Sequence, residues 1–388
     1  MLVIEARDRI GGRIHTIRER GVVEAGAEFV HGETAATWEI ITQCGLKTEE
    51  WQLEDQGKRL FARSGKLLPD PVSLGAEVEK IQEKISSYSG SEISVGEIIR
   101  QQPQSEDARF YAARQLVDVE AAEPEQLSAP GFNREQNLAS NDARNFWITD
   151  GYSRVIEDLA KGLHLVLSQP VTRVQWREGA VRVESNSGAL FHGRRLVLTI
   201  PIGVMRKGPL FDPELPPELT SAFHAIGFGN STKLAVWLDD LKALPDFALL
   251  DSDGMFGHFW PRLFGPVPVL VGFSGGKRAD ELTAMGEAAA IQTGIDELAR
   301  AFGSAIRNKI SAVRHFTWSD DPYAMGSYSY PAVGMEFASA TLRKPVADTI
   351  YYTGEAANDR GHAATVHGAI EAGRMTAAEI LRSTAASD

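Results

Sequence analysis

The residues whose types and spacing suit chemistry appear at the very start of the chain. Leu2, Val3 and Ile4 form an apolar run, which predicts a parallel strand buried on both faces, and the run ends at Glu5. In dinucleotide-binding folds, an acidic residue at the end of the second strand accepts hydrogen bonds from the adenosine ribose. Glu5 fits that position. The pattern is weak by itself, because the G-x-G-x-x-G loop that should precede the strand is not in the sequence.

A glycine pair and an arginine follow at Gly11, Gly12 and Arg13. Paired glycines let the backbone approach a ligand closely. An adjacent guanidinium can pair with a pyrophosphate in a forked, charge-assisted geometry. From the spacing alone, an ordinary turn with a solvated arginine is an equal alternative.

Composition limits the classes of function. The chain has 388 residues, enough for two or three domains, and its 43% hydrophobic and 24% charged residues are typical of a globular protein. The 40 Lys and Arg against 52 Asp and Glu give a net charge of −12. An acidic chain is a poor default binder of nucleic acid, so no nucleic-acid partner is expected.

Cysteine and histidine usage points away from metals and disulfides. Cys44 is the only cysteine, which excludes an intrachain disulfide and a cysteine-based zinc site. His31, His362 and His367 are not spaced as a metal-binding set, so no metal is predicted. No apolar run is long enough for a membrane helix and no signal peptide is evident, so we expect no membrane partner and a cytoplasmic location.

Hydrophobic periodicity predicts the elements that position these residues. Helices are expected at 34–45, 151–163, 215–226, 285–302 and 367–383, with a polar helical stretch over 71–122. Strands are expected at 164–167, 171–176, 180–184, 195–200, 233–238, 267–273 and 347–353, the first three forming a β-meander. Residues 123–150 are expected to be irregular. The pattern describes an interleaved two-domain α/β protein whose nucleotide-binding domain combines segments from the start, middle and end.

Several segments carry a family resemblance. EARDRIGGRIHT (5–16) and VEAGAEFVHG (23–32) closely resemble the N-terminal signature of flavin-containing amine oxidases, which include monoamine oxidases, polyamine oxidases and lysine-specific histone demethylases. Four later segments are similar to that family in the same order: RLVLTIPIGVM (195–205), IGFGNSTKLAVWL (226–238), WSDDPYAMGSYSYP (318–331) and YYTGEAANDRGHAATVHGAIEAG (351–373). The resemblance spans almost the whole chain and is weakest over about 60–150.

The resemblance implies a fold and a division into domains. An FAD-binding Rossmann-like domain of the glutathione-reductase type would comprise residues 1–55, 150–205 and 345–388. An α+β substrate-binding domain would comprise 56–149 and 206–344. The family's first strand, its G-x-G-x-x-G turn and its first helix, about 30 residues, would precede Met1. We therefore expect the chain as written to bind FAD poorly or to fold badly.

The resemblance also assigns residues to the cofactor. Glu5 would bind the adenosine ribose, Gly12 and Arg13 would lie along the pyrophosphate and flavin, and Ala27 and Glu28 would lie near the isoalloxazine. The remaining predicted cofactor-binding residues are Arg7 and Gly11 in the first turn, Val171 at the adenine, Gly354 and Glu355 at the ribityl–pyrophosphate region, and Thr365 and Val366, whose backbone N–H groups would face the flavin. Ser327 stands where covalent family members carry a cysteine, so FAD would be bound non-covalently.

Three residues would act beside the flavin. The family's equivalent of Lys233 reaches flavin N5 through a water, and a buried lysine in an apolar site needs such a functional reason. A surface lysine at a strand edge is the alternative. Trp318 and Tyr328 would line the substrate cavity. Thr365 would replace the second cavity aromatic of monoamine oxidases, as in the demethylases and some polyamine-oxidase-like members.

The activity implied is FAD-dependent oxidation of a small-molecule amine. A hydride equivalent would pass from the α-carbon to flavin N5, water would hydrolyse the resulting imine, and O2 would reoxidise the flavin to give hydrogen peroxide. One alternative is an FAD-dependent dehydrogenase or desaturase of the same superfamily, which the Lys233 context disfavours. The other is a truncated non-catalytic protein that does not bind FAD, which the missing glycine loop favours.

Overall fold

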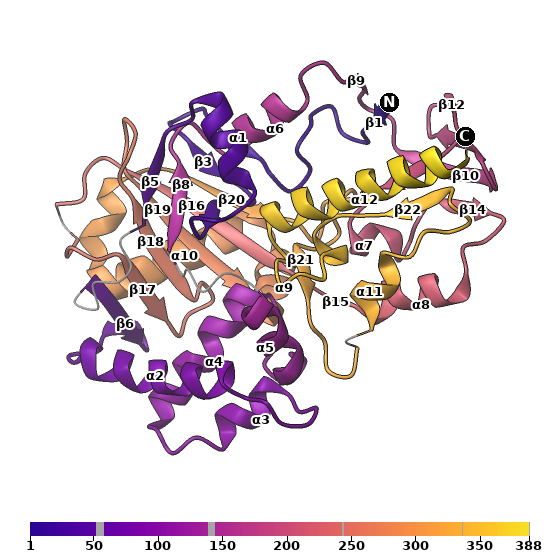
Figure 1. Cartoon of the computed structure of the whole chain (residues 1–388). Coiled ribbons are helices and arrows are strands. Elements are labelled where there is room, and N and C mark those ends of the chain that lie inside the picture. Colours follow the sequence, from indigo (N-terminus) through magenta and orange to yellow (C-terminus); the bar gives the residue numbers. More distant parts are fainter. Residues whose placement is uncertain (52–57, 139–143, 243, 336, 388) are drawn as a thin grey trace.

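The computed structural model describes residues 1–51, 58–138, 144–242, 244–335 and 337–387 (Figure 1). Its largest sheet has seven strands and is antiparallel throughout except where β17 and β6 run parallel. In spatial order the strands are β20 (Ile310–Thr317), β16 (Ser231–Leu238), β19 (Val269–Gly275), β18 (His258–Arg262), β17 (Leu249–Ser252), β6 (Arg59–Arg63) and β7 (Lys66–Leu67).

Strand β16 explains how this sheet separates two cores. All eight of its residues are buried, since β19 and β20 flank it on both edges. Leu234 and Val236 pack into an apolar cluster with the helices behind the sheet, whereas Ala235 and Trp237 pack into an aromatic cluster on the other face. Because side chains alternate along a strand, Lys233 shares the face of Ala235 and Trp237. The alternative of a strand-edge surface lysine is therefore wrong.

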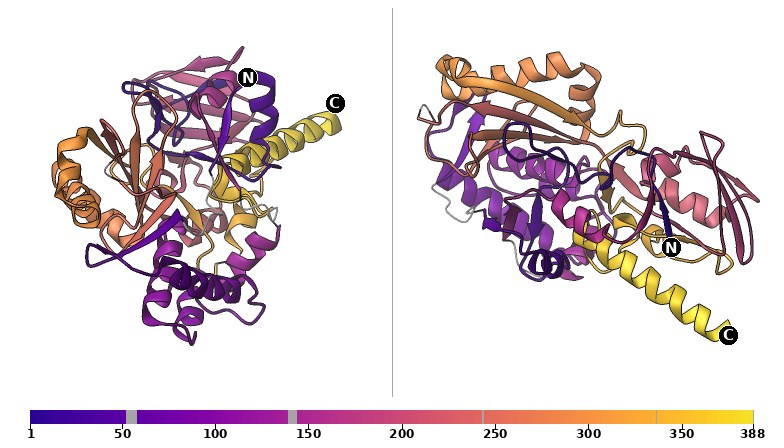
Figure 2. Two further views of the ribbon diagram at one scale, coloured as in Figure 1. Left: turned by 90° about the vertical axis from the view of Figure 1, so that its left-hand side faces the viewer. Right: turned by 90° about the horizontal axis from the view of Figure 1, so that it is seen from above.

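Helices cover both faces of the large sheet, as Figure 2 shows. α9 (Gly276–Ala284) and α10 (Glu287–Phe302) supply one apolar layer with β16. The opposite side carries α2 (Pro71–Ser86), α3 (Val95–Arg100), α4 (Glu106–Glu120) and α5 (Ala129–Leu138). The predicted helical stretch over 71–122 is confirmed. Asp70, Ser94 and Ser105 cap its three helices by accepting hydrogen bonds from backbone N–H groups.

The predicted irregular stretch 123–150 is wrong, because it contains α5 and strand β8 (Asn145–Ile148). Pro130 lies in the first turn of α5, where a helix does not need the backbone N–H that proline lacks. β8 pairs with β4 (Phe29–His31) and β5 (Thr48–Glu50) in a three-stranded sheet. The elements that flank the strands of this sheet in the sequence are α1 (Thr37–Cys44), α6 (Ser153–Leu159) and the two-stranded ribbon of β2 (Thr16–Ile17) and β3 (Val23–Glu24).

The segments predicted for the nucleotide-binding domain form two parallel pairs. β1 (Leu2–Ile4) pairs with β9 (His164–Val166), and β13 (Leu196–Leu198) pairs with β22 (Ile350–Tyr352). β9 thus lies outside the predicted meander, which consists of β10 (Val171–Arg177), β11 (Ala180–Ser185) and β12 (Leu190–Gly193), with β14 (Leu210–Asp212) parallel to β10. The prediction that β1 is buried on both faces is wrong. Leu2 is 38% exposed, and β9 is the only strand among the described residues that pairs with β1.

The remaining elements close the molecule. They are α7 (Ile202–Met205), α8 (Pro217–Ala225), β15 (Gly227–Gly229), the 3-10 segment η2 (Ser304–Lys309), β21 (Tyr328–Tyr330), α11 (Ala338–Leu342), the 3-10 turn η3 (Glu355–Ala357) and α12 (Val366–Ser387). The end of α12 projects away from the body (Figure 2). The division into domains stays a prediction, and its 55/56 boundary lies outside the described residues. Within the described ranges, no helix has both the length and the apolar character needed to cross a bilayer.

Candidate active site

The first glycine turn meets the last third of the chain through Arg13. Gly11 and Gly12 have φ of 102° and 56°, values that favour glycine, so the backbone turns sharply just before Arg13. The Arg13 guanidinium donates to the Ser327 carbonyl at 2.5 Å and to Glu355 Oε1 at 2.8 Å. Three predicted segments therefore converge on one guanidinium.

Glu355 is the hub of this convergence. It begins η3, directly after Gly354, whose φ of 139° turns the chain out of β22. Besides the Arg13 guanidinium, its carboxylate accepts from Ser329 Oγ at 2.5 Å and from the Ala364 backbone N–H at 3.0 Å. The side chain is 7% exposed, and these donors satisfy it fully.

Helix α12 begins where the sequence predicted. Thr365 caps it, because its hydroxyl accepts from the Gly368 backbone N–H at 3.0 Å and donates to the His362 carbonyl at 2.7 Å. The free N–H groups of the first turn, starting at Val366, make this end of the helix a partial positive charge. The end is suited to an anion or to a group that gains negative charge.

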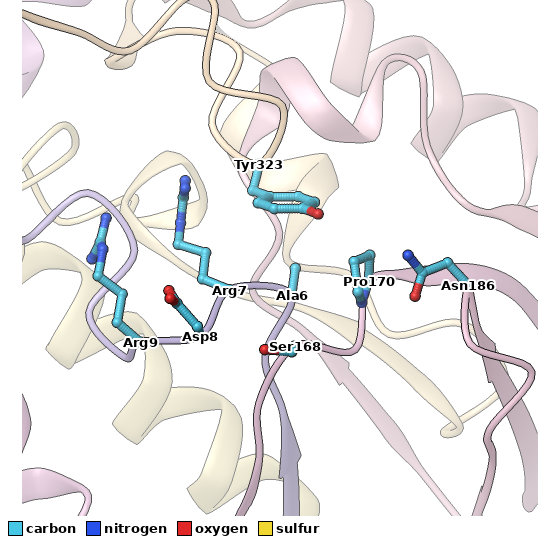
Figure 3. Close-up of a pocket in the computed structure, with 8 residues that line it drawn as sticks. All are labelled: Ala6, Arg7, Asp8, Arg9, Ser168, Pro170, Asn186 and Tyr323. Atoms are coloured by element: carbon cyan, nitrogen blue, oxygen red, sulfur yellow. The ribbon is translucent and has the colours of Figure 1, made fainter.

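A cavity of about 410 Å³ opens beside β1 (Figure 3). Residues 6–9, Ser168, Pro170, Asn186 and Tyr323 line it, and Figure 3 shows Ala6 and Pro170 below the Tyr323 ring. Arg7 is fixed by a bidentate ion pair with Asp321, each N–O distance being 2.6 Å.

Only part of this cavity was predictable from the sequence. Of the predicted residues, Arg7 lines it, whereas Glu5 and Val171 are chain neighbours of lining residues without lining it themselves. Glu5 Oε1 instead accepts from the Arg7 backbone N–H at 2.8 Å. Tyr323, Asn186 and Asp321 were missed. The tyrosine in WSDDPY was the available signal for Tyr323. The resemblance, however, relates the whole of segment 318–331 to the substrate cavity.

Lys233 lies in the interior and points at the second predicted segment. Its ammonium donates to the Gly26 carbonyl at 2.8 Å and to Glu28 Oε2 at 2.5 Å, and the residue is only 7% exposed. The backbone at Gly26 is tightly enclosed, since a Cβ there would lie 1.8 Å from the Arg13 carbonyl oxygen and 2.9 Å from the Trp318 ring. Trp318 is itself anchored by its indole N–H, which donates to the Ala25 carbonyl at 3.0 Å.

Glu28 is surrounded by donors. Its Oε1 accepts from the indole N–H groups of Trp147, at 3.0 Å, and Trp260, at 3.2 Å. Burial by itself would raise the pKa of Glu28, but Lys233 and Arg262 outweigh it and hold the pKa below its ordinary value. Glu28 is therefore a buried carboxylate that pairs with Lys233 as an anion.

Tyr328 is held by the end of α4. Its hydroxyl donates to the Val119 carbonyl at 2.9 Å, one of the carbonyls that the last turn of a helix leaves without an intrahelical partner. Burial and the nearby carboxylate of Glu120 raise the pKa of Tyr328 well above its ordinary range. The ring is thus suited to orient a ligand, not to transfer protons.

Two carboxylates near this ring were missed by the sequence analysis. Glu120 and Glu135 are half-buried, and neither has a hydrogen bond or ion pair with any residue that the structure describes. Burial raises the pKa of Glu120 to about 7. Burial and the neighbouring Glu120 raise the pKa of Glu135 to about 8. Both lie in the stretch 60–150, where the resemblance is weakest. Their positions in the sequence did not mark them as site residues.

Comparison with known proteins decides the family. The family model described as flavin-containing amine oxidoreductase matches residues 1–381. The chain belongs to the flavin-containing amine oxidase family. Polyamine oxidase 2 of Arabidopsis thaliana is 27% identical over 97% of this chain and 82% of that protein. Lysine-specific histone demethylase 1 homolog 2 of the same plant is 26% identical over 98% of this chain and 55% of that protein.

Solved structures of this family share the fold. A putrescine oxidase bound to putrescine superposes with a TM-score of 0.83 at 20% identity, covering 98% of this chain and 93% of the other. The cyclohexylamine oxidase of Brevibacterium oxydans IH-35A gives a TM-score of 0.79 at 21% identity, covering 99% and 93%. The predicted α/β fold and the predicted FAD-dependent oxidation of amines are therefore confirmed. The desaturase alternative loses its support.

The residues present fit FAD. The 410 Å³ cavity is of ligand size, the Arg13 guanidinium would offer a cation to a pyrophosphate, and the α12 N-terminus would suit a group that gains negative charge. Ser327 has no thiol, and Cys44, the one cysteine of the sequence, lies at the end of α1, so FAD would be held without a cysteine linkage. When bound, FAD takes up the two electrons released as the amine is oxidised to an imine.

This chain's own residues supply position and charge. Lys233 places a cation in a site from which water is largely excluded, Trp318 and Gly26 fix the backbone to which Lys233 is bonded, and Tyr328 presents a ring whose hydroxyl is already engaged. The individual roles predicted for the site residues stay predictions. In the part of the chain that the structure describes, no three His, Cys, Asp or Glu side chains form a group able to hold a metal ion.

Proposed function

We propose that this amine oxidase acts on a small amine that carries a second cationic nitrogen, a diamine or a polyamine, with O2 as oxidant and hydrogen peroxide as product. One amine group, in its neutral form, would be oxidised beside Tyr328. The second nitrogen, as an ammonium, would bind between Glu120 and Glu135.

The observation that carries this proposal is the pair of carboxylates without partners. The charges of Glu120 and Glu355 raise the pKa of both Glu135 and Tyr328, so the three carboxylates lie around one region beside the Tyr328 ring. Glu355 is already satisfied by Arg13 and Ser329. Glu120 and Glu135 repel each other, and Arg134 offsets this repulsion only in part, since the pKa of Glu135 stays raised. An ammonium between the two carboxylates would remove the repulsion and the cost of enclosing unpaired charge.

The names of similar proteins agree with this proposal. They include a polyamine oxidase and a putrescine oxidase bound to putrescine. These names describe those proteins. For this chain the proposal rests on the two carboxylates, and it predicts a preference for diamines over monoamines of the same length.

The test compares putrescine with 1-aminobutane, which lacks the second nitrogen. A charge-assisted hydrogen bond contributes about 1.5–3 kcal/mol, so we expect kcat/KM for putrescine to exceed that for 1-aminobutane by about ten-fold to a hundred-fold. Glu120→Gln and Glu135→Gln should each remove much of this preference and leave the 1-aminobutane rate unchanged. Glu125→Gln, at an exposed residue paired with Arg100, is the matched control. Equal rates on the two amines would contradict the proposal.

A further inference from the structure

Arg262 is an unusual residue in the core behind the site. It is 1% exposed, and none of its three guanidinium nitrogens has a hydrogen-bond partner among the residues that the structure describes. Its guanidinium lies over the Phe264 ring, 3.9 Å from the centroid. An isolated buried charge is costly, so a buried arginine with no hydrogen-bond partner calls for an electrostatic reason.

The sheet places Arg262 on the face that carries Lys233. Arg262 ends β18, two residues after Trp260, so alternation directs both side chains to the same side. In register, Trp260 lies beside Val271, which lies beside Ala235, the residue two positions after Lys233. Trp260 donates its indole N–H to Glu28, and the Lys233 ammonium lies 6.0 Å from the Trp260 ring. Arg262, Trp260 and Lys233 thus approach Glu28 from one wall.

The charges of this wall are linked through Glu28. Burial and then Lys233 and Arg262 are the strongest influences on the Glu28 carboxylate, and the two cations keep it ionised. Glu28 in turn is the strongest of the neighbouring charges that favour the Arg262 cation against its burial. Glu24 and Glu49 also face Arg262. Glu24 is fully buried and is bonded to Thr16 and to the Tyr152 backbone N–H, not to Lys233.

We propose that Arg262, with the indoles of Trp147 and Trp260, is a positioning residue that holds Glu28 as an anion facing Lys233. Lys233 is then fixed by two acceptors, the Gly26 carbonyl and the Glu28 carboxylate, with one of its three N–H bonds left for a ligand. The proposal concerns amine oxidation in general and does not depend on the diamine preference.

The test measures the midpoint reduction potential of the flavin in the purified holoenzyme. Removing a cation near a group that gains negative charge disfavours its reduction, and removing an anion favours it. We expect Arg262→Met to lower the potential and Glu28→Gln to raise it. Arg262→Lys, which keeps the charge, should leave the potential close to that of the parent. Glu297→Gln, a buried glutamate bonded to the backbone of Met255 and Phe256, is the matched control and should change nothing.

Opposite shifts separate this proposal from a loss of packing, which would move both variants in the same direction. Unchanged potentials, or shifts of one sign, would overturn it. If Arg262→Met does not fold, Arg262→Gln, which also removes the charge, takes its place, and an unchanged or raised potential in that variant contradicts the proposal. A second readout needs no flavin: Glu28→Gln should change the tryptophan emission of the protein, since two indole N–H groups donate to Glu28, whereas Glu297→Gln should not.

Discussion

Arg13 Nη1 lies 2.8 Å from Glu355 Oε1, and this contact joins residues 342 positions apart. It connects the first glycine turn to the segment that leads into α12, the two ends of the chain that the family resemblance assigns to the cofactor. The Glu355 side chain is almost fully enclosed, while Arg13 is one-quarter exposed. We expect the loss of this ion pair to lower both the unfolding free energy and the amount of FAD that the protein retains.

A double-mutant cycle should detect this contact. Arg13→Met and Glu355→Gln should each destabilise the protein, and the double variant should be less destabilised than the sum by about 0.5–3 kcal/mol. Chemical unfolding of the four proteins measures the difference. FAD content should fall in both single variants. Strict additivity would show that the two side chains do not act together.

The space around Gly26 predicts a sharp effect from one methyl group. Gly26→Ala would place a Cβ against the Arg13 carbonyl and the Trp318 ring, and the backbone that receives Lys233 would have to move. We expect a loss of at least 1–3 kcal/mol in unfolding free energy and a lower kcat. The matched control is Gly373→Ala in α12, where a Cβ meets no atom within 4 Å. That substitution should be neutral or stabilising by about 0.5–1 kcal/mol. A neutral Gly26→Ala would refute this reading of the site.

The raised pKa values of Glu120 and Glu135, about 7 and about 8, predict how diamine binding depends on pH. A cation binds the ionised carboxylates, and these lose their protons as pH rises through this range. Between pH 6 and 9 the ratio of kcat/KM for putrescine to that for 1-aminobutane should therefore rise. Below the pKa values of both amines, the fraction of neutral reactive amine rises with pH by the same factor for both substrates, so the ratio removes this dependence. In the double Gln variant the ratio should be flat, and a flat ratio in the parent would contradict the assignment.

Two histidines with lowered pKa values predict acid sensitivity. Partial burial and the neighbouring Arg9 and Arg7 lower the pKa of His15 to about 4, and burial and two neighbouring histidines lower the pKa of His367 to about 4. Between pH 6.5 and 4 the unfolded chain binds protons that these folded-state imidazoles do not, so the unfolding free energy should fall as pH is lowered through that window. The slope is at most about 1.4 kcal/mol per pH unit for each histidine. His367→Gln should reduce the slope, and His192→Gln, at an exposed position, should leave it unchanged. Equal slopes in all three proteins would exclude this contribution.

The elements with long, regular patterns were predictable from the sequence. The strand 233–238, the helices near 285–302 and 367–383, and the strands 171–176 and 180–184 all occur close to their expected limits. β17 and β18 were missed because their polar and charged residues are buried by neighbours far away in the chain, and β20 was missed because exposed polar residues interrupt its apolar pattern. α5 was missed because Pro130 and several asparagines are typical of irregular segments, although Pro130 occupies the first turn of the helix.

Site residues that belong to short sequence motifs were predictable. Contacts between residues that are distant in the sequence were not. Lys233, Glu28, Trp318 and Arg13 were named from their motifs, but nothing local indicated that Lys233 pairs with Glu28. Arg262, Glu120 and Glu135 have ordinary sequence surroundings. Arg262 is buried without a hydrogen-bond partner, and Glu120 and Glu135 are half-buried without one, a property that exists only once the chain has folded.

The most direct measurement is the absorbance spectrum of the purified protein, after incubation with excess FAD and removal of the unbound cofactor, before and after anaerobic addition of putrescine. The account predicts the blue and near-ultraviolet bands of bound flavin, their bleaching by the diamine, and their return with release of hydrogen peroxide when O2 is admitted. A colourless folded protein, or a yellow protein that neither putrescine nor any other amine bleaches, would contradict it.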